Sequence, residues 1–259
     1  MRDAGFAVIT GASTGIGYEL ARFAVEDGYD VLICADEPEI EEAADKLRRL
    51  GGTVQTVQAD LATMDGVNML WAAMGDKPVD LLFANAGRAL GNAFHEQDWT
   101  KIERLICLNM IQTTLLIHRT GLRMQARGSG RILVTGSIGG FVAGPYDAVY
   151  NATKAYLDSL SYALNDEWKD SAVTITCLMP GPTDTPIFHR PENDLAETPI
   201  AKSEGKDDVT KVARAGYDAM MAGQPGIVPG LTSKVIAMLA GVVPQGILAQ
   251  IHRMGAKPE

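Results

Sequence analysis

Short apolar runs alternate with longer helical patterns along most of the chain, and this alternation restricts the fold more than any other feature. The runs are nearly continuous in Val, Ile and Leu, as in VLICA and LLFA. Continuous runs are typical of strands buried on both faces of a parallel sheet. Because parallel neighbours need a crossover helix, the pattern predicts an α/β fold, a doubly wound parallel sheet of Rossmann type with helices on both faces. The predicted strands cover residues 6–10, 30–35, 53–58, 79–84, 131–135, 173–178 and 225–228.

The helical patterns between these runs are long enough to serve as crossovers. They cover residues 14–27, 37–50, 64–74, 97–125, 147–169 and 209–222. No internal repeat or low-complexity linker interrupts the 259 residues, so we predict one domain over residues 1–259. Within it, the proline-rich stretch 182–208 suits an excursion over the surface better than a regular element.

The C-terminal segment, residues 231–252, is strongly apolar. Residues 235–251 carry no charge over 17 positions, and Gly241, Pro244 and Gly246 interrupt them. A membrane-spanning helix needs about 20 predominantly apolar residues. The segment therefore favours two short helices packed on the body over a membrane anchor. We hypothesise that these helices contribute to a subunit contact or a membrane-surface contact.

The composition is that of a soluble globular protein, with 46% hydrophobic and 21% charged residues. A net charge of -9 without clustered Lys and Arg argues against a nucleic-acid partner. Cys34, Cys107 and Cys177 lie far apart in apolar runs, and the histidines are isolated, so we predict reduced thiols and no metal site. The first predicted strand begins at Phe6, which leaves no room for a signal segment, and we expect a cytoplasmic protein.

A glycine-rich turn, TGASTGIG, follows the first predicted strand and leads directly into a helix. Such a turn lets the backbone approach a pyrophosphate, and the helix N-terminus supplies free amides with a partial positive charge. Glycines also serve ordinary tight turns, but a position inside a βαβ unit favours nucleotide binding. The predicted cofactor-binding residues of this turn are Gly11, Ser13, Thr14, Gly15, Ile16 and Gly17.

Asp36 ends the second predicted strand, about 20 residues after the glycine turn, where a carboxylate can accept bonds from the adenosine ribose. A carboxylate there would repel a 2′-phosphate, and Thr14 supplies no positive charge to hold one. The cofactor prediction is therefore NAD, with NADP less favoured. The alternative is that Asp36 only caps the following helix.

Tyr150 and Lys154 are four positions apart in a predicted helix, so their side chains project from one face. A nearby ammonium favours the phenolate and would lower the pKa of Tyr150. Taken alone, such a pair occurs by chance on many solvated helix faces. Its meaning depends on the groups that surround it.

At these positions the chain resembles the short-chain dehydrogenase/reductase family, over nearly its whole length. The glycine turn matches TGxxxGIG of that family, Asn85-Ala86-Gly87 matches its NAG motif, and Tyr150 with Lys154 matches its YxxxK. Ser137 lies 13 residues before Tyr150, the spacing of the family's catalytic serine. The other matching positions are Asn109 in the long helix, Asp60 and Leu61 after the third strand, and Pro180, Gly181, Thr183 and Thr185 in the PGxxxT segment. One small departure is Ala84, where relatives often carry a second asparagine.

The resemblance implies an NAD-dependent oxidoreductase that interconverts a secondary alcohol and a ketone. Tyr150 would exchange a proton with the substrate oxygen, and Ser137 would donate a hydrogen bond to it. Lys154 would hold the nicotinamide ribose, and Asn109 would hold a water that relays the proton. The resemblance also implies a homodimer or homotetramer built on the helices 97–125 and 147–169.

Each of these residues also has a purely structural interpretation. Ser137 can cap a turn, Asn109 can be a satisfied buried amide, and Lys154 can be solvated. Asn85-Ala86-Gly87 can be a tight turn after a strand. At the level of function, the alternatives are an NAD-binding redox sensor or scaffold, and another reaction, such as epimerisation or dehydration, on the same fold.

The substrate pocket is predicted beyond the carboxyl ends of the strands, from residues 88–94, 138–146 and 182–199. Apolar side chains in these stretches favour a partly apolar alcohol or ketone; they include Phe141, Val142, Tyr146, Ile187 and Phe188. Arg88 can pair with an anionic group or form a salt bridge. The excursion 182–208 is a candidate lid.

Overall fold

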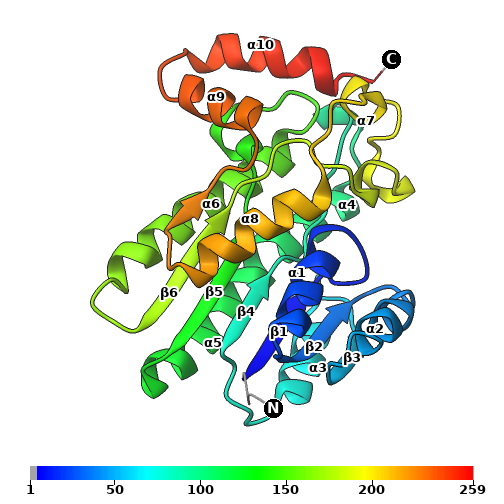
Figure 1. Cartoon of the computed structure of the whole chain (residues 1–259). Coiled ribbons are helices and arrows are strands. Elements are labelled where there is room, and N and C mark those ends of the chain that lie inside the picture. Colours follow the sequence, from blue (N-terminus) through cyan, green and yellow to red (C-terminus); the bar gives the residue numbers. More distant parts are fainter. Residues whose placement is uncertain (1–4, 259) are drawn as a thin grey trace.

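Seven parallel strands form one sheet in the order β3-β2-β1-β4-β5-β6-β7 in the computed structural model, which describes residues 5–258 (Figure 1). The strands are β1 (Phe6–Thr10), β2 (Asp30–Ala35), β3 (Val54–Gln58), β4 (Leu81–Ala84), β5 (Gly130–Thr135), β6 (Val173–Leu178) and β7 (Gly226–Ile227). The predicted doubly wound Rossmann-type fold is confirmed. The order reverses at β1, so the crevice where such folds bind nucleotides lies between β1 and β4.

Helices cover both faces of the sheet. They are α1 (Gly15–Glu26), α2 (Ile40–Arg48), α3 (Met64–Met74), α4 (Trp99–Ile106), α5 (Thr113–Arg127), α6 (Ala148–Glu167), α7 (Pro199–Lys202), α8 (Val209–Met221), α9 (Leu231–Ala240) and α10 (Gln245–Ala256). Short turns of 3-10 helix cover η1 (Phe94–Glu96), η3 (Ile138–Phe141), η4 (Pro186–Phe188) and η5 (Pro191–Asn193).

Alternate residues of the central strands enter two separate hydrophobic cores. In β1, Ala7 and Ile9 pack with α1, α2 and α8, whereas Phe6 and Val8 pack on the side of α3, α5 and α6. All five residues of this strand are buried. Burial on both faces is the physical reason why the strand sequences are continuously apolar.

The predicted helix 97–125 is not continuous, which corrects one expectation. It is divided into α4 and α5 by the π-helical segment η2 (Cys107–Gln112). A π-turn adds a residue to the helical repeat and shifts the side chains that follow, and such turns are frequent at functional sites. Asn109 lies inside this segment.

Two segments that follow β6 lie outside the regular strand and helix alternation. The excursion 182–208 closes on itself, because the Asp207 amide donates to the Pro182 carbonyl at 2.7 Å and the Asp184 amide donates to the Asp207 carbonyl at 2.9 Å. The apolar C-terminal segment forms the two short helices α9 and α10, which lie together at one end of the molecule (Figure 1). None of the helices within residues 5–258 is both long and apolar enough to cross a membrane.

Candidate active site

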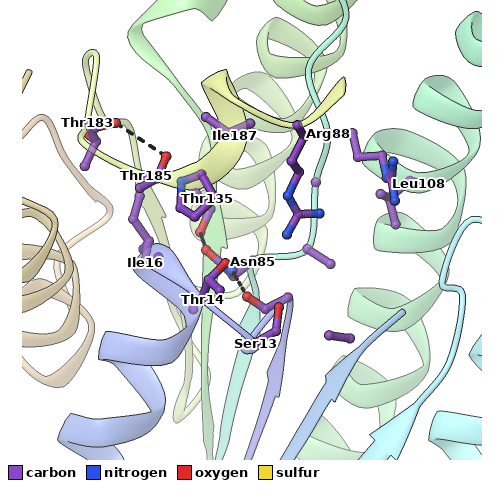
Figure 2. Close-up of a pocket in the computed structure, with 18 of the residues that line it drawn as sticks. Ser13, Thr14, Ile16, Asn85, Arg88, Leu108, Thr135, Thr183, Thr185 and Ile187 are labelled. Carbon is purple, nitrogen blue, oxygen red and sulfur yellow. Dashed lines mark hydrogen bonds between the residues drawn. The ribbon is translucent and has the colours of Figure 1, made fainter. Parts of the chain in front are cut away.

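The turns that follow β1 to β6 meet at the carboxyl edge of the sheet and enclose one groove (Figure 2). Almost every site residue predicted from the sequence lines it. These lining residues are Gly11, Ser13, Thr14, Gly15, Ile16, Gly17, Asp36, Asp60, Leu61, Asn85, Ala86, Gly87, Ser137, Tyr150, Lys154, Pro180, Gly181, Thr183 and Thr185. Asn109 is the exception, because it is buried behind the groove wall.

The glycine turn has the shape that a dinucleotide needs. Gly11 and Gly15 have φ of +65° and +62°, which few other residues adopt without strain. A Cβ on Gly17 would lie 2.1 Å from the Gly11 carbonyl oxygen, so only glycine allows the turn to close. Thr14 makes no side-chain cap at the start of α1, and the first amides of that helix remain available to an anion. The turn therefore fits a pyrophosphate.

Asn85 braces this turn. Its Nδ2 donates to the carbonyl oxygens of Thr10 at 3.0 Å and Gly11 at 3.2 Å. Its Oδ1 accepts from Thr135 Oγ1 at 3.0 Å. The side chain thus ties the β1 turn to the end of β5, which holds the groove open at the switch point.

Ser137 and Tyr150 come together at the inner end of the groove. Ser137 follows β5, and its Oγ accepts from the Gly139 amide at 3.0 Å and lies 3.4 Å from the Pro180 carbonyl oxygen. Tyr150 lies on the first turns of α6 and is half-buried. Burial raises the pKa of the Tyr150 phenol to about 12, although its hydrogen bond with Ser137 acts in the opposite direction.

The pKa of Tyr150 is therefore raised, whereas we expected from the sequence that Lys154 would lower it. The Lys154 Nζ lies 5.7 Å from the centre of the Tyr150 ring and donates to the Thr135 carbonyl at 2.8 Å. Burial also lowers the pKa of Lys154 to about 8. Desolvation of the phenol therefore outweighs the effect of the ammonium.

Asn109 is a buried amide whose oxygen and nitrogen both form hydrogen bonds. Its Oδ1 accepts from the Arg88 amide at 3.0 Å, and its Nδ2 donates to the Arg88 carbonyl and to Thr153 Oγ1, both at 3.0 Å. These bonds fasten the loop after β4 to α6, one turn from Tyr150. These contacts agree with the purely structural interpretation of Asn109, a buried amide with hydrogen-bond partners.

Asp158 lies against Ser137 but was not among the residues predicted from the sequence. Its carboxylate is buried beneath Ser137, and its Oδ1 accepts from the Ser137 amide at 3.3 Å. A Cβ on Gly136 or Gly140 would lie 1.8 Å or 2.2 Å from its oxygens, so two glycines make room for it. Burial raises the pKa of Asp158 to about 6. Its position four residues after Lys154, on the same helix face, was the available signal.

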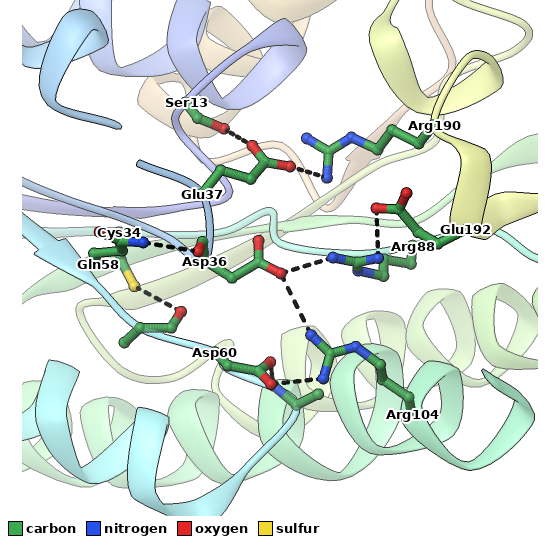
Figure 3. Close-up of polar contacts among 12 residues, drawn as sticks. Ser13, Cys34, Asp36, Glu37, Gln58, Asp60, Arg88, Arg104, Arg190 and Glu192 are labelled. Atoms are coloured by element: carbon green, nitrogen blue, oxygen red, sulfur yellow. Dashed lines mark hydrogen bonds and ion pairs between the residues drawn. The ribbon is translucent and has the colours of Figure 1, made fainter. Parts of the chain in front are cut away.

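The part of the groove that follows β2 and β3 is lined by paired charges (Figure 3). Asp36 Oδ2 lies 2.7 Å from Arg88 Nη2 and 3.4 Å from Arg104 Nη2, and Arg104 Nη1 lies 2.6 Å from Asp60. These contacts lower the pKa of Asp36 despite its burial. Asp36 does not cap the following helix, because α2 begins only at Ile40. Of the two alternatives for Arg88, an anionic partner or a salt bridge within the protein, the structure shows the salt bridge, and it lies inside the groove.

The excursion 182–208 is fastened across this part of the groove by further ion pairs. Arg88 Nη1 lies 2.7 Å from Glu192, and Arg190 pairs with Glu37, whose other oxygen accepts from Ser13 Oγ at 2.7 Å. Figure 3 shows Arg190 extending from the excursion to Glu37, and Glu192 beside Arg88. Because charged pairs between distant segments leave no periodic pattern, Glu37 and Arg190 could not be recognised from the sequence.

The predicted substrate stretches line the groove only in part. Arg88, Ile187 and Phe188 contribute, and Arg88 and Ile187 are both drawn in Figure 2. Phe141, Val142 and Tyr146 do not line the groove, which corrects that expectation. Tyr146 instead lies under Arg253 of α10, whose guanidinium carbon is 5.6 Å from the centre of the Tyr146 ring.

Asp147 and His252 form a buried pair at the start of α6. Asp147 Oδ2 lies 3.7 Å from His252 Nε2. Burial raises the pKa of Asp147 to about 7 and lowers the pKa of His252. The charge of Asp147 also contributes to the raised pKa of Tyr150.

We expect this pair to make stability depend on pH. Because the folded-state pKa of Asp147 lies above its unfolded value, its contribution is complete below about pH 4 and is lost as the pH rises through about 7. Asp147→Asn should therefore gain about 2 to 3 kcal/mol relative to the wild type between about pH 5 and about pH 8. Urea unfolding of both proteins at the two pH values measures this gain. Parallel pH curves for the two proteins would contradict the assignment.

Comparison with known proteins agrees with this geometry. The family model described as short chain dehydrogenase matches residues 5–196. The chain belongs to the short-chain dehydrogenase family. As a member it is an oxidoreductase that acts on CH-OH or C=O groups and binds a nicotinamide dinucleotide.

Three relatives of this short-chain dehydrogenase cover most of its length. The 3-dehydrosphinganine reductase TSC10B of Arabidopsis thaliana is 31% identical over 92% of this chain and 74% of its own. The cis-4-hydroxycyclohexanecarboxylate dehydrogenase of Sinomonas cyclohexanicum is 32% identical over 76% of this chain and 80% of its own. A solved short-chain dehydrogenase from Sphingobium yanoikuyae, in complex with NADPH, has a TM-score of 0.81 at 28% identity and covers 93% of this chain and 97% of its own.

Proposed function

We propose that this protein interconverts a secondary alcohol and a ketone with NAD as cofactor, on a small and partly apolar substrate. One observation carries the proposal: Ser137, Tyr150 and Lys154 line the same groove as the glycine turn. A redox sensor or scaffold would need the glycine turn but not this set of proton-handling groups.

Tyr150 is the proposed general acid and base. With a pKa of about 12, the phenol is protonated at neutral pH and can donate its proton to the substrate oxygen during ketone reduction. Ser137 Oγ, on the same wall, donates a hydrogen bond to that oxygen and stabilises the charge that develops there. The bound nicotinamide supplies and accepts the hydride.

Lys154 and Asn109 are proposed to assist Tyr150 and Ser137, Lys154 toward the cofactor and Asn109 toward the proton relay. Lys154 holds the nicotinamide ribose and offers a positive charge close to the Tyr150 ring. The Asn109 Oδ1 has a second lone pair beyond its bond to Arg88, with which it can hold a water for proton relay. Asp158 is a positioning residue in this scheme, because it holds the Ser137 amide.

The choice of NAD rests on Asp36. The Asp36 carboxylate faces the groove where an adenosine ribose would lie, and a carboxylate repels a 2′-phosphate. Arg88 and Arg104 neutralise part of that charge, and the related Sphingobium yanoikuyae structure contains NADPH. We therefore propose a preference for NAD, not exclusion of NADP.

Asp36→Ala is expected to weaken NAD binding by about tenfold while NADP binding stays equal or becomes tighter, because the variant loses a ribose acceptor and a repelling charge together. Titration of both cofactors against both proteins measures the change. Glu41→Ala is the matched control, since Glu41 is an exposed carboxylate on α2 beyond the groove. A wild type that already binds NADPH more tightly than NADH would overturn the NAD preference.

We further propose a homo-oligomer in a reducing, cytoplasmic compartment. Ile111, Leu122 and Tyr162 are exposed on η2, α5 and α6, the helices on which the family resemblance predicts subunit contacts. The three cysteines are free thiols, which suits a reducing compartment.

A screen of alcohols and ketones with NAD(H) and NADP(H) tests the function, with Tyr150→Phe as the blank. Turnover of any member that depends on Tyr150 supports the proposal. Tight cofactor binding without turnover across a broad set of ketones would favour the sensor instead.

A further inference from the structure

An exposed apolar surface at the C-terminal end of the chain has no role in the proposed reaction. Half of the large hydrophobic side chains that are exposed among residues 5–258 lie between residues 231 and 254. We define the C-terminal apolar surface by Leu231, Val235, Met238, Val242, Ile251 and Met254. Exposed patches of this kind mark sites of contact, because leaving them in water is unfavourable.

The surface follows one face of each C-terminal helix. Leu231, Val235 and Met238 recur at i, i+4 and i+7 on α9, and Ile251 and Met254 continue a similar stripe on α10. The turn between the helices is also apolar, and Val242 at its tip is 79% exposed. Turn tips are ordinarily polar, so an exposed valine there indicates that the tip enters an apolar medium.

The opposite sides of the two helices are attached to the body. Ser233 is buried against Gly181, where an added Cβ would lie 2.1 Å from its Oγ. Gln245 accepts from the Ala143 amide at 2.9 Å and donates to the Phe141 carbonyl at 3.2 Å. The apolar surface is therefore held in a fixed orientation, next to the segment that follows Ser137.

The charge of this segment is opposite to that of the whole protein. The chain carries a net charge of -9, yet residues 231–259 contain three basic residues, Lys234, Arg253 and Lys257, and one acidic residue, Glu259. Apolar side chains combined with cations are the combination that binds anionic membrane surfaces, where each basic residue near the surface contributes about 1 kcal/mol.

We propose that α9 and α10 dock this protein on the surface of a membrane rich in anionic lipids, with the turn at Val242 dipping between the headgroups. Contact lies in the plane of the membrane, since neither helix is long enough to span it. A second copy fits less well, because a symmetric dimer through this surface would bring together two segments that both carry a net positive charge. The proposal is independent of the proposed reaction.

Sedimentation of the full-length protein with vesicles tests the proposal. We expect binding to vesicles that contain phosphatidylglycerol, at least tenfold weaker binding to vesicles of phosphatidylcholine alone, and weakening by salt. The double variant Met238→Glu, Val242→Glu should lose at least tenfold in binding to the anionic vesicles. Met69→Glu is the matched control, since Met69 is 53% exposed on α3, away from this surface, and it should bind as the wild type does.

Three results would overturn the proposal. One is a folded wild type that sediments with neither vesicle. Another is a double variant that binds the anionic vesicles as well as Met69→Glu does. The third is a wild type that ignores vesicles while the double variant lowers its oligomeric state, which would assign the surface to a second copy of the chain.

Discussion

Replacing Tyr150 with Phe is expected to lower kcat by about a hundred- to ten-thousandfold, the range that a positioned general acid contributes. Only the hydroxyl is removed, and the ring keeps its packing against Leu90 and Ile102. The fold and the affinity for the cofactor should therefore be unchanged. Steady-state kinetics and cofactor titration on the same preparations separate the two effects.

Tyr156→Phe is the matched control for this experiment. Tyr156 lies on the same helix, but its hydroxyl is exposed and lies 3.0 Å from Thr114 Oγ1, outside the groove. We expect wild-type turnover from this variant. If the folded Tyr150→Phe protein also kept wild-type turnover, Tyr150 would have no part in the chemistry.

Gly17→Ala is expected to have a second large effect, because it distorts the glycine-rich turn and so weakens both stability and cofactor binding. The new Cβ would lie 2.1 Å from the Gly11 carbonyl oxygen and 2.5 Å from Asn85 Nδ2. The backbone must then move, at a cost of about 1 to 3 kcal/mol of stability. The movement also displaces the amides that face the pyrophosphate, so cofactor binding should fall by at least about tenfold.

Gly246→Ala supplies the comparison, because nothing lies within 4 Å of a Cβ at that position. It should keep the stability and the cofactor affinity of the wild type, measured by urea unfolding and titration. Equal cofactor affinity in Gly17→Ala and Gly246→Ala would show that the turn does not carry the binding.

The sheet could be predicted from the sequence because its strands are buried on both sides. The bounds of β1, β2 and β6 agree with the predicted runs, since each of these strands is buried over nearly all of its length. The weaker strand β7 is only two residues long, and little burial specifies it. A strand can therefore be predicted from its apolar sequence pattern when it is buried in the fold.

The electrostatic part of the site could not be predicted in the same way. The pKa of Tyr150 depends on how far the phenol is removed from water, which spacing along a helix does not encode. The pairs of Asp36 with Arg88 and Arg104 join residues 52 and 68 positions apart. The π-turn at Asn109 likewise depends on tertiary packing and not on helix propensity.

We propose that ketones are reduced in this groove by hydride from the reduced nicotinamide, while Tyr150 donates the proton to the ketone oxygen. The wild type is mixed with reduced cofactor and with a ketone that was found in the screen. The amount of cofactor oxidised is then compared with the amount of alcohol formed. We predict equal amounts of the two, and neither in Tyr150→Phe despite normal cofactor binding. Formation of alcohol at the wild-type rate by Tyr150→Phe, or consumption of cofactor without alcohol, would contradict the claim.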